Sequence, residues 1–117
     1  MITVPPGLRI MVASEPIDFR KGLDGMVAVV QRHLGFDPFA GDLFVFRSKR
    51  SDRIKVVAWD GTGLFLFYKR LEEGRFTWPP IRQGAMTLTA AQFAMLLEGL
   101  DWTRVRPVAV KRPTVAG

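Results

Sequence analysis

Basic side chains gather in one short stretch of this sequence. Five of them fall between residues 47 and 55: Arg47, Lys49, Arg50, Arg53 and Lys55. Lysine and arginine groups placed together in this way neutralise nucleic-acid phosphates and release the bound counterions. The alternative is a solvated turn whose charges discourage pairing at a sheet edge. We expect the first, a site for a nucleic-acid backbone.

The rest of the basic charge supports this interpretation. Nine basic and four acidic residues give residues 47–82 a net charge of +5, whereas residues 1–46 carry −1. Lys69, Arg70 and Arg75 belong to the same block and are expected on the same sheet, with Arg82 nearby. Charge concentrated in this way favours a localised anionic partner.

Aromatic residues are interleaved with the basic ones: Trp59, Phe65, Phe67, Tyr68 and Trp78. An exposed aromatic sheet can stack unpaired bases. Aromatic residues of strands more often pack against helices, and we favour that interpretation. Bases could stack only on a face that the helices leave open.

The acidic residues do not predict catalysis. The candidates for a two-metal site are Asp18, Asp24, Asp42, Asp52 and Asp60. Asp18 has the position of a helix cap, and Asp52 and Asp60 those of turn residues. A single histidine, His33, without any cysteine makes neither a standard zinc site nor a Ser-His-Asp triad. We therefore expect no enzyme, no metal, no cofactor and no small-molecule substrate.

A mixed-charge group lies near the start of the first predicted helix: Asp18, Arg20, Lys21 and Asp24. These side chains form either a surface for a partner protein or local ion pairs of little energetic weight. The residues alone slightly favour local ion pairs.

The elements that must position these side chains follow from the hydrophobic pattern. Three runs rich in aromatic and β-branched residues, 43–47, 53–59 and 64–69, are separated by short turns and predict an antiparallel meander. Residues 8–12 and 75–78 predict two further short strands.

Two helices complete the prediction. The first has Asp18 as its N-cap and ends at Gly35, with an apolar face that includes Met26 and Val30. The second begins at Thr89, which has capping-box spacing with Gln92. The fold class is therefore α+β: a small antiparallel meander packed against one or two helices.

Length and composition favour one globular domain in this 117-residue chain, which is 48% apolar and has no cysteine. We expect it to span residues 1–102, with a flexible basic tail at 103–117. The start of the sequence lacks the pattern of a secretory signal, and no apolar run approaches a membrane span. We therefore expect a cytoplasmic location and no membrane partner.

Several motifs in order resemble one family, the TnpB accessory proteins (second open reading frame) of insertion-sequence-sixty-six-type bacterial transposable elements. The similarity covers about residues 8–102. It rests on an Asp-x-Arg-Lys-Gly-x-Asp-Gly motif at 18–25 and on the segments 37–46, 59–63, 68–72, 74–79, 88–89 and 96–101.

The resemblance implies a non-catalytic accessory role in transposition, beside a larger protein that carries the transposase chemistry. Its expected partners are DNA, either the element ends or DNA in general, and the transposase or other proteins of the same element. Because the Asp18–Asp24 group belongs to the family motif, the resemblance also favours its interpretation as a partner-binding surface. The alternative is a protein-interaction module that binds no nucleic acid.

Overall fold

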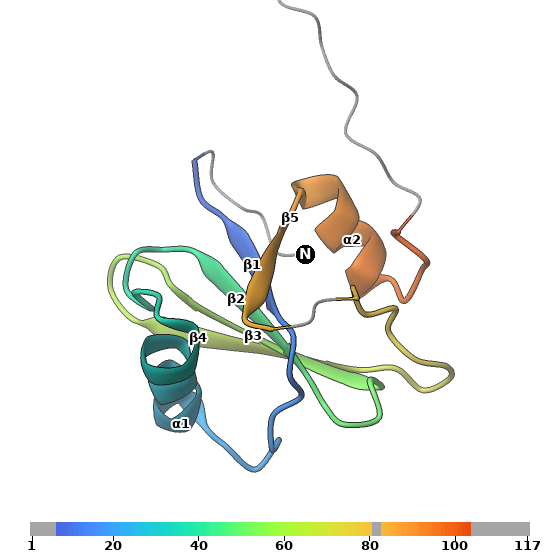
Figure 1. The fold of residues 1–117 in the computed structure, drawn as a ribbon, viewed down its shortest axis with the longest axis horizontal. Helices are drawn as coiled ribbons and strands as arrows, with labels where there is room; N and C mark the ends of the chain where they lie inside the picture. Colours follow the sequence, from blue (N-terminus) through green and yellow to red (C-terminus); the bar gives the residue numbers. More distant parts are fainter. Residues whose placement is uncertain (1–6, 81–82, 104–117) are drawn as a thin grey trace, which may run out of the picture.

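A five-stranded mixed sheet forms the centre of the molecule (Figure 1). The structure is a computed structural model, and it describes residues 7–80 and 83–103. The strand order is β4-β3-β2-β1-β5. The strands are β1 (Ile10–Ala13), β2 (Leu43–Arg47), β3 (Arg53–Trp59), β4 (Leu64–Arg70) and β5 (Ala85–Leu88). With its two helices this is a small α+β fold, as predicted.

The predicted meander is confirmed. β2, β3 and β4 pair antiparallel through short turns, and β2 and β3 have the predicted bounds. The sheet as a whole is mixed rather than antiparallel, because β1 runs parallel to β2. A parallel pair needs a crossover connection, and the first helix lies in that connection.

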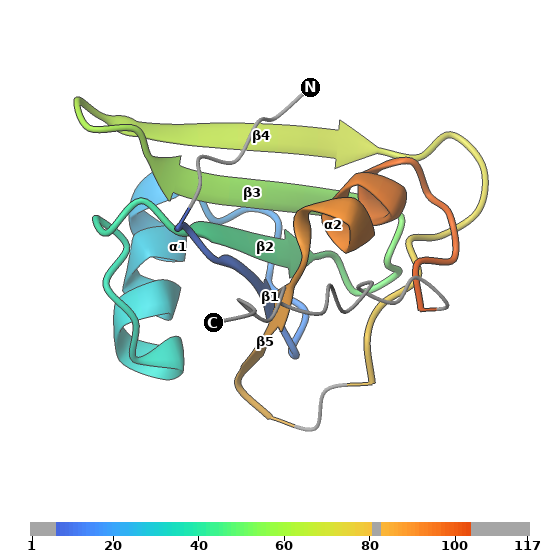
Figure 2. The ribbon, with the colours of Figure 1, turned by 90° about the horizontal axis from the view of Figure 1, so that it is seen from above.

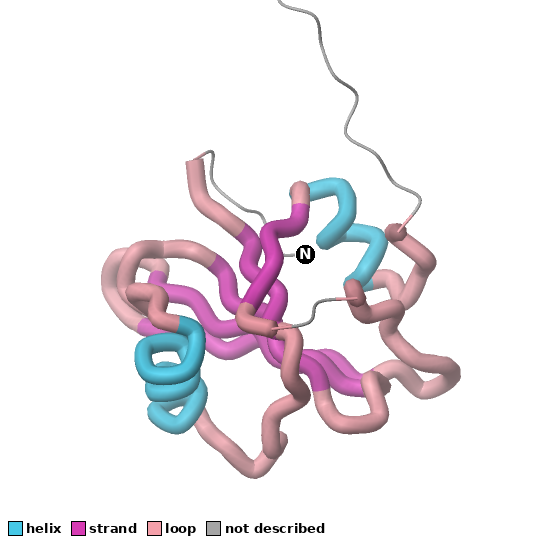
Figure 3. The backbone as a smooth tube through the Cα atoms, in the orientation of Figure 1, coloured by secondary structure: helices cyan, strands magenta, loops and turns pink. Residues whose placement is uncertain are grey.

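The prediction of a strand at residues 75–78 is wrong. The chain runs as a loop there (Figure 3), tied down by side chains rather than by a strand ladder. The indole of Trp78 donates to the Ala13 carbonyl at 2.8 Å, and the indole of Trp102 donates to Thr77 at 2.6 Å. The fifth strand is instead β5, which pairs antiparallel with β1 and was not predicted.

The first helix begins later than predicted. α1 covers Leu23–Ala28 and continues as the π-helix η1, Val29–Leu34, which ends at Gly35 in the left-handed conformation with φ 73°. Its N-cap residue is Gly22, so the assignment of Asp18 as the cap is wrong. Residues 18–21 form a separate turn, closed by the Lys21 N–H donating to the Asp18 carbonyl at 3.0 Å.

The second helix, α2 (Ala90–Leu97), starts as predicted. The Thr89 hydroxyl accepts from the Gln92 N–H at 3.1 Å, and the Gln92 side chain accepts from the Thr89 N–H at 2.9 Å. This reciprocal pair is a capping box. Leu88 and Phe93 on either side of the cap are both buried in the same core.

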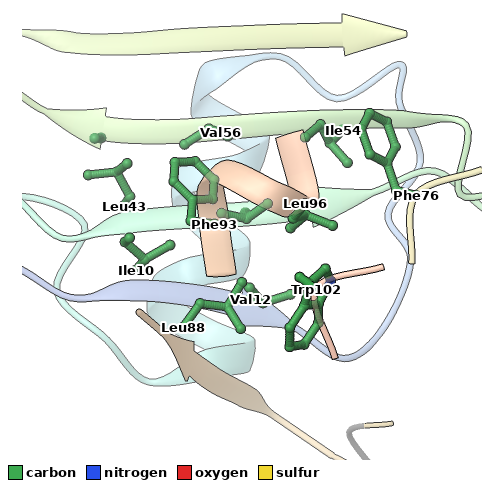
Figure 4. Close-up of a cluster of buried hydrophobic side chains, with 12 residues drawn as sticks. Ile10, Val12, Leu43, Ile54, Val56, Phe76, Leu88, Phe93, Leu96 and Trp102 are labelled. Atoms are coloured by element: carbon green, nitrogen blue, oxygen red, sulfur yellow. The ribbon is translucent and has the colours of Figure 1, made fainter. Parts of the chain in front are cut away.

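The two helices cover opposite faces of the sheet (Figure 2). Successive strand side chains alternate between the faces, so each strand supplies both cores. Below α2, Phe93 and Leu96 pack on Ile10, Val12 and Val56 (Figure 4). On the α1 side, Met26 and Val30 pack on Phe44 and Phe46.

Other predictions fall partly outside these residues. The tail predicted at 103–117 lies, except for Thr103, beyond the described part of the chain, as does Arg82. No helix within the described ranges is long and apolar enough to cross a membrane.

Candidate nucleic-acid interface

Hydrogen bonds fix the backbone of the turn between β2 and β3, which carries several of the predicted cations. The Ser48 N–H donates to the Arg53 carbonyl at 3.0 Å, and the Ser51 N–H donates to the Ser48 carbonyl at 3.0 Å. The Ser48 hydroxyl donates to the Asp52 carboxylate at 3.1 Å. Lys49 and Arg50 stand exposed at the tip of this turn. The backbone beneath them needs little ordering on contact with a polyanion, because these hydrogen bonds already fix it.

The segment that follows β4 lies against the same turn. The Leu71 N–H donates to the Asp52 carbonyl at 2.8 Å, and the Phe76 N–H donates to the Ser51 carbonyl at 2.6 Å. Arg75 immediately precedes Phe76 and is exposed. The tertiary structure therefore adds a second run of chain to the predicted basic turn.

One end of the sheet thus carries five exposed cations. Arg53 is the register partner of Arg70, so the first residue of β3 lies beside the last residue of β4. We call these residues the basic end: Lys49, Arg50, Arg53, Arg70 and Arg75. Three carboxylates belong to the same turns, those of Asp52, Glu72 and Glu73. Arg70 is ion-paired with Glu72 at 3.1 Å.

Lys55 does not contribute to this surface. It is only 7% exposed, and its ammonium group donates to the carbonyls of Phe19 at 2.8 Å and Lys21 at 3.1 Å. These bonds hold the turn before α1 against the sheet. A buried ammonium group needs such partners, since an unpaired one is costly to desolvate. Its place in the basic cluster reflects sequence spacing alone.

Lys69 and Arg47 are also engaged inside the fold. On the α2 face, the Lys69 ammonium group donates to the Leu97 carbonyl at 2.5 Å, where a cation suits the C-terminal end of the helix. The half-buried Arg47 guanidinium lies over the Trp78 ring at 5.8 Å and donates to the Ser14 carbonyl at 3.4 Å. Lys55, Lys69 and Arg47 therefore all bind groups of the protein itself.

The aromatic residues divide between core and surface. Phe65, Phe67 and Trp78 pack against the α2 core, as favoured above. Trp59 packs edge-on against Phe39 with 5.6 Å between the ring centroids. Tyr68 differs, because 48% of it is exposed. It lies on β4, two residues before Arg70.

The mixed-charge group lies beside the basic end. A cavity of about 420 Å³ joins them, lined by Pro16, Ile17, Asp18, Phe19, Ser48 and Lys49. Within the group, Arg20 closes onto Asp18 at 2.6 Å, which makes a local ion pair. Hydrogen bonds from the Arg20 side chain and backbone lower the pKa of Asp18 to about 2. The side chains of Lys21 and Asp24 are exposed.

The other carboxylates have local structural roles. Asp42 is buried and binds the Arg9 guanidinium at 2.8 Å, joining the starts of β2 and β1. Backbone hydrogen bonds from Thr62 and Gly63 lower the pKa of Asp60 in the β3–β4 turn. Nowhere in residues 7–80 and 83–103 do three or more His, Cys, Asp or Glu side chains form a group that could hold a metal ion.

Comparison with known proteins identifies the family of this chain. The family described as IS66 Orf2 like protein matches residues 8–107. The chain belongs to the IS66 Orf2-like family, as its motifs predicted, and this membership suggests an accessory role in transposition.

Two relatives from Sinorhizobium fredii match over nearly their full lengths. The "uncharacterized protein y4jC" is 52% identical over 114 residues, which is 97% of each chain. The "uncharacterized protein y4hO" is 38% identical over 117 residues, the full length of both chains. No solved structure matches this chain.

Sequence reasoning missed two components of the site. Glu72 and Glu73 reduce the net positive charge of the basic end. Only the contact between the 71–76 segment and the β2–β3 turn places them there. The exposure of Tyr68 was the other omission. The strict alternation of β4 offered a partial signal, because Tyr68 and Arg70 had to share a face opposite to Phe67 and Lys69.

Proposed function

We propose that this protein is a non-catalytic accessory factor that binds DNA through the basic end and holds the transposase of the same element through the Asp18–Asp24 group. Its contribution is positioning, because it brings the catalytic protein and the DNA together. The basic end supplies sequence-independent contacts to phosphates.

One observation carries the DNA half of the proposal. Lys49, Arg50 and Arg53 extend from a rigid turn, and none of them forms an ion pair with a carboxylate of residues 7–80 and 83–103. Exposed, uncommitted cations on adjoining turns can meet successive phosphates of one strand. The cations of the same strands that have structural partners, such as Lys55 and Lys69, donate to backbone carbonyls instead.

The alternative is a module that binds only proteins. Asp52, Glu72 and Glu73 lie among the cations and support it, because a mixed-charge surface suits a protein partner of complementary pattern. The five cations still outnumber the three carboxylates, so the surface as a whole favours a polyanion.

A salt titration tests the DNA half. If all five cations contact phosphates, log affinity for duplex DNA should fall against log salt concentration with a slope of roughly −4.5. The double variant Arg50→Glu/Arg53→Glu removes two contacts and adds repulsion. Its slope should be no steeper than roughly −2.7, with much weaker binding at low salt.

Arg32→Glu is the matched control for the single variant Arg50→Glu, because Arg32 is exposed on η1 and both changes alter the net charge equally. Binding should respond strongly to the change at Arg50 and weakly to that at Arg32. Equal responses, or a slope near zero for the native protein, would contradict DNA binding by the basic end and leave the protein-only alternative.

A pull-down of the purified element transposase, with and without terminal DNA, tests the other half. Lys21→Glu and Asp24→Lys reverse the exposed charges of the group and should reduce retention of the transposase, whereas Gln31→Lys on η1 should not. Undiminished retention by both variants would show that the transposase, if bound, docks elsewhere.

A further inference from the structure

The exposed tyrosine lies on the outermost strand of the sheet. β4 is an edge strand (Figure 2). Its side chains alternate between the α2 core and the face that α1 covers. On the α1 face, Leu66 and Tyr68 remain 38% and 48% exposed. α1 therefore leaves part of this face open at β4, which is the condition that base stacking requires.

Two neighbours support the Tyr68 ring. Phe19 lies at 6.1 Å between ring centroids, tilted by 58°. The Lys55 ammonium group lies 4.9 Å from the Phe19 centroid and 6.0 Å from that of Tyr68. Lys55 is itself fixed by two backbone carbonyls, so the aromatic pair rests on an anchored base. A ring held in this way loses little conformational freedom when a ligand stacks on it.

Two arginines of the basic end share this face with the tyrosine. Lys55 pairs with Tyr68 across β3 and β4, and Arg53 pairs with Arg70 two residues further along. Residues two apart on one strand are separated by about 6.6 Å. Exposed guanidinium groups therefore stand next to an exposed ring on the same strand pair.

We propose that Tyr68 stacks on an unpaired base of a DNA strand whose phosphates contact Arg53 and Arg70. A duplex presents phosphates but keeps its base faces stacked inside, so the arginines alone can serve a duplex, whereas the ring serves a single strand. Leu66, the next exposed side chain on this face, extends the apolar surface along β4. This inference rests on the proposed DNA binding and names the form of DNA that this face accepts.

The chain contains one tyrosine, which makes a selective probe available. Full-length protein labelled with 3-fluorotyrosine should give a single fluorine NMR signal, from position 68. Adding a 15-nucleotide oligo-dT should shift or broaden that signal, because the base ring current acts on the tyrosine ring. The blunt duplex of the same length should leave it nearly unchanged. An unchanged signal at saturating oligo-dT would overturn the inference.

Binding of variants gives an independent measurement. Tyr68→Ala should weaken oligo-dT binding by about tenfold or more in fluorescence anisotropy, with less than a twofold change for the duplex. Tyr68→Phe retains the ring and should bind oligo-dT like the native protein. Equal weakening of both DNA forms by Tyr68→Ala would overturn the inference.

The outcomes separate this inference from the proposed function. If Arg50→Glu/Arg53→Glu abolishes binding while Tyr68→Ala changes nothing, DNA binding stands and stacking fails. If neither DNA form binds the native protein, the proposed function itself fails. If Tyr68→Ala instead changes the molar mass in solution, the exposed ring belongs to a contact between copies of the chain, and the stacking assignment is wrong.

Discussion

Two lysines that are six residues apart in the sequence have different roles in this protein. Lys49 presents its charge to solvent, whereas Lys55 directs its ammonium group to the carbonyls of Phe19 and Lys21. The difference follows from where each side chain leaves the sheet. Lys49 lies on the turn, and Lys55 points from β3 beneath the segment that precedes α1.

This difference predicts unequal effects on stability. Lys55→Met keeps the aliphatic packing but leaves the carbonyls of Phe19 and Lys21 without the ammonium donor, so it should lower the free energy of unfolding by about 1–3 kcal/mol. Urea denaturation measures the change. Lys49→Met, an equal change in charge on the turn, should stay within about 0.5 kcal/mol of the native protein. Comparable losses for the two variants would contradict the structural role of Lys55.

At the scale of elements, the two ends of α2 are stabilised differently. Residues next to the helix in sequence stabilise its start, whereas a residue far away in sequence stabilises its end. Thr89 and Gln92 satisfy the first free N–H groups, and both residues belong to the helix's own sequence. The C-terminal end receives the Lys69 ammonium group from β4, which accounts for a cation that sequence spacing had assigned to DNA. The start of α2 is therefore stabilised by its own sequence, and its end by a side chain of the edge strand β4.

The cap predicts a graded pair of variants. Thr89→Ala removes the acceptor for the Gln92 N–H and should destabilise the protein by about 1 kcal/mol. Thr89→Ser keeps the hydroxyl and should change the free energy of unfolding by a few tenths of a kcal/mol at most. Thermal or chemical unfolding followed by circular dichroism distinguishes them. A Ser variant as unstable as the Ala variant would mean that the methyl group, not the hydrogen bond, matters at this position.

At the scale of the whole molecule, two tryptophans bind segments that are far apart in sequence. The indole of Trp102, buried in the α2 core, donates to Thr77, and the indole of Trp78 donates to Ala13 on β1. The chain after α2 is thereby joined to the segment between β4 and β5, and that segment to the sheet. Trp102 is the last buried core residue in the described part of the chain.

This closure predicts where the domain can be shortened. A chain of residues 1–103 should unfold at the same denaturant concentration as the full-length protein, because it retains every described core residue. Trp102→Ala in the full-length chain should lower the free energy of unfolding by about 3–5 kcal/mol, as expected for removing a buried tryptophan. A shortened chain as unstable as the Trp102→Ala variant would refute a domain that ends near residue 102.

The sequence by itself determined the features that depend on near neighbours. Alternating aromatic and β-branched runs, separated by short turns, specify β2, β3 and β4, since pairing of consecutive strands needs only a turn between them. The capping box at Thr89 is likewise complete within four residues. The family was also evident, because the order of motifs survives without any knowledge of their spatial arrangement.

Only the tertiary structure decided which members of the basic cluster face solvent. Alternation divides a strand's side chains between two faces, but it does not say which face receives a helix or a loop. That depends on the crossover through α1, the parallel pairing of β1 with β2 and the return of residues 71–76 to the turn. These long-range contacts, together with the packing of α2 beside β4, bury Lys55, engage Lys69 and leave Tyr68 exposed, and none of them has a local signature in the sequence.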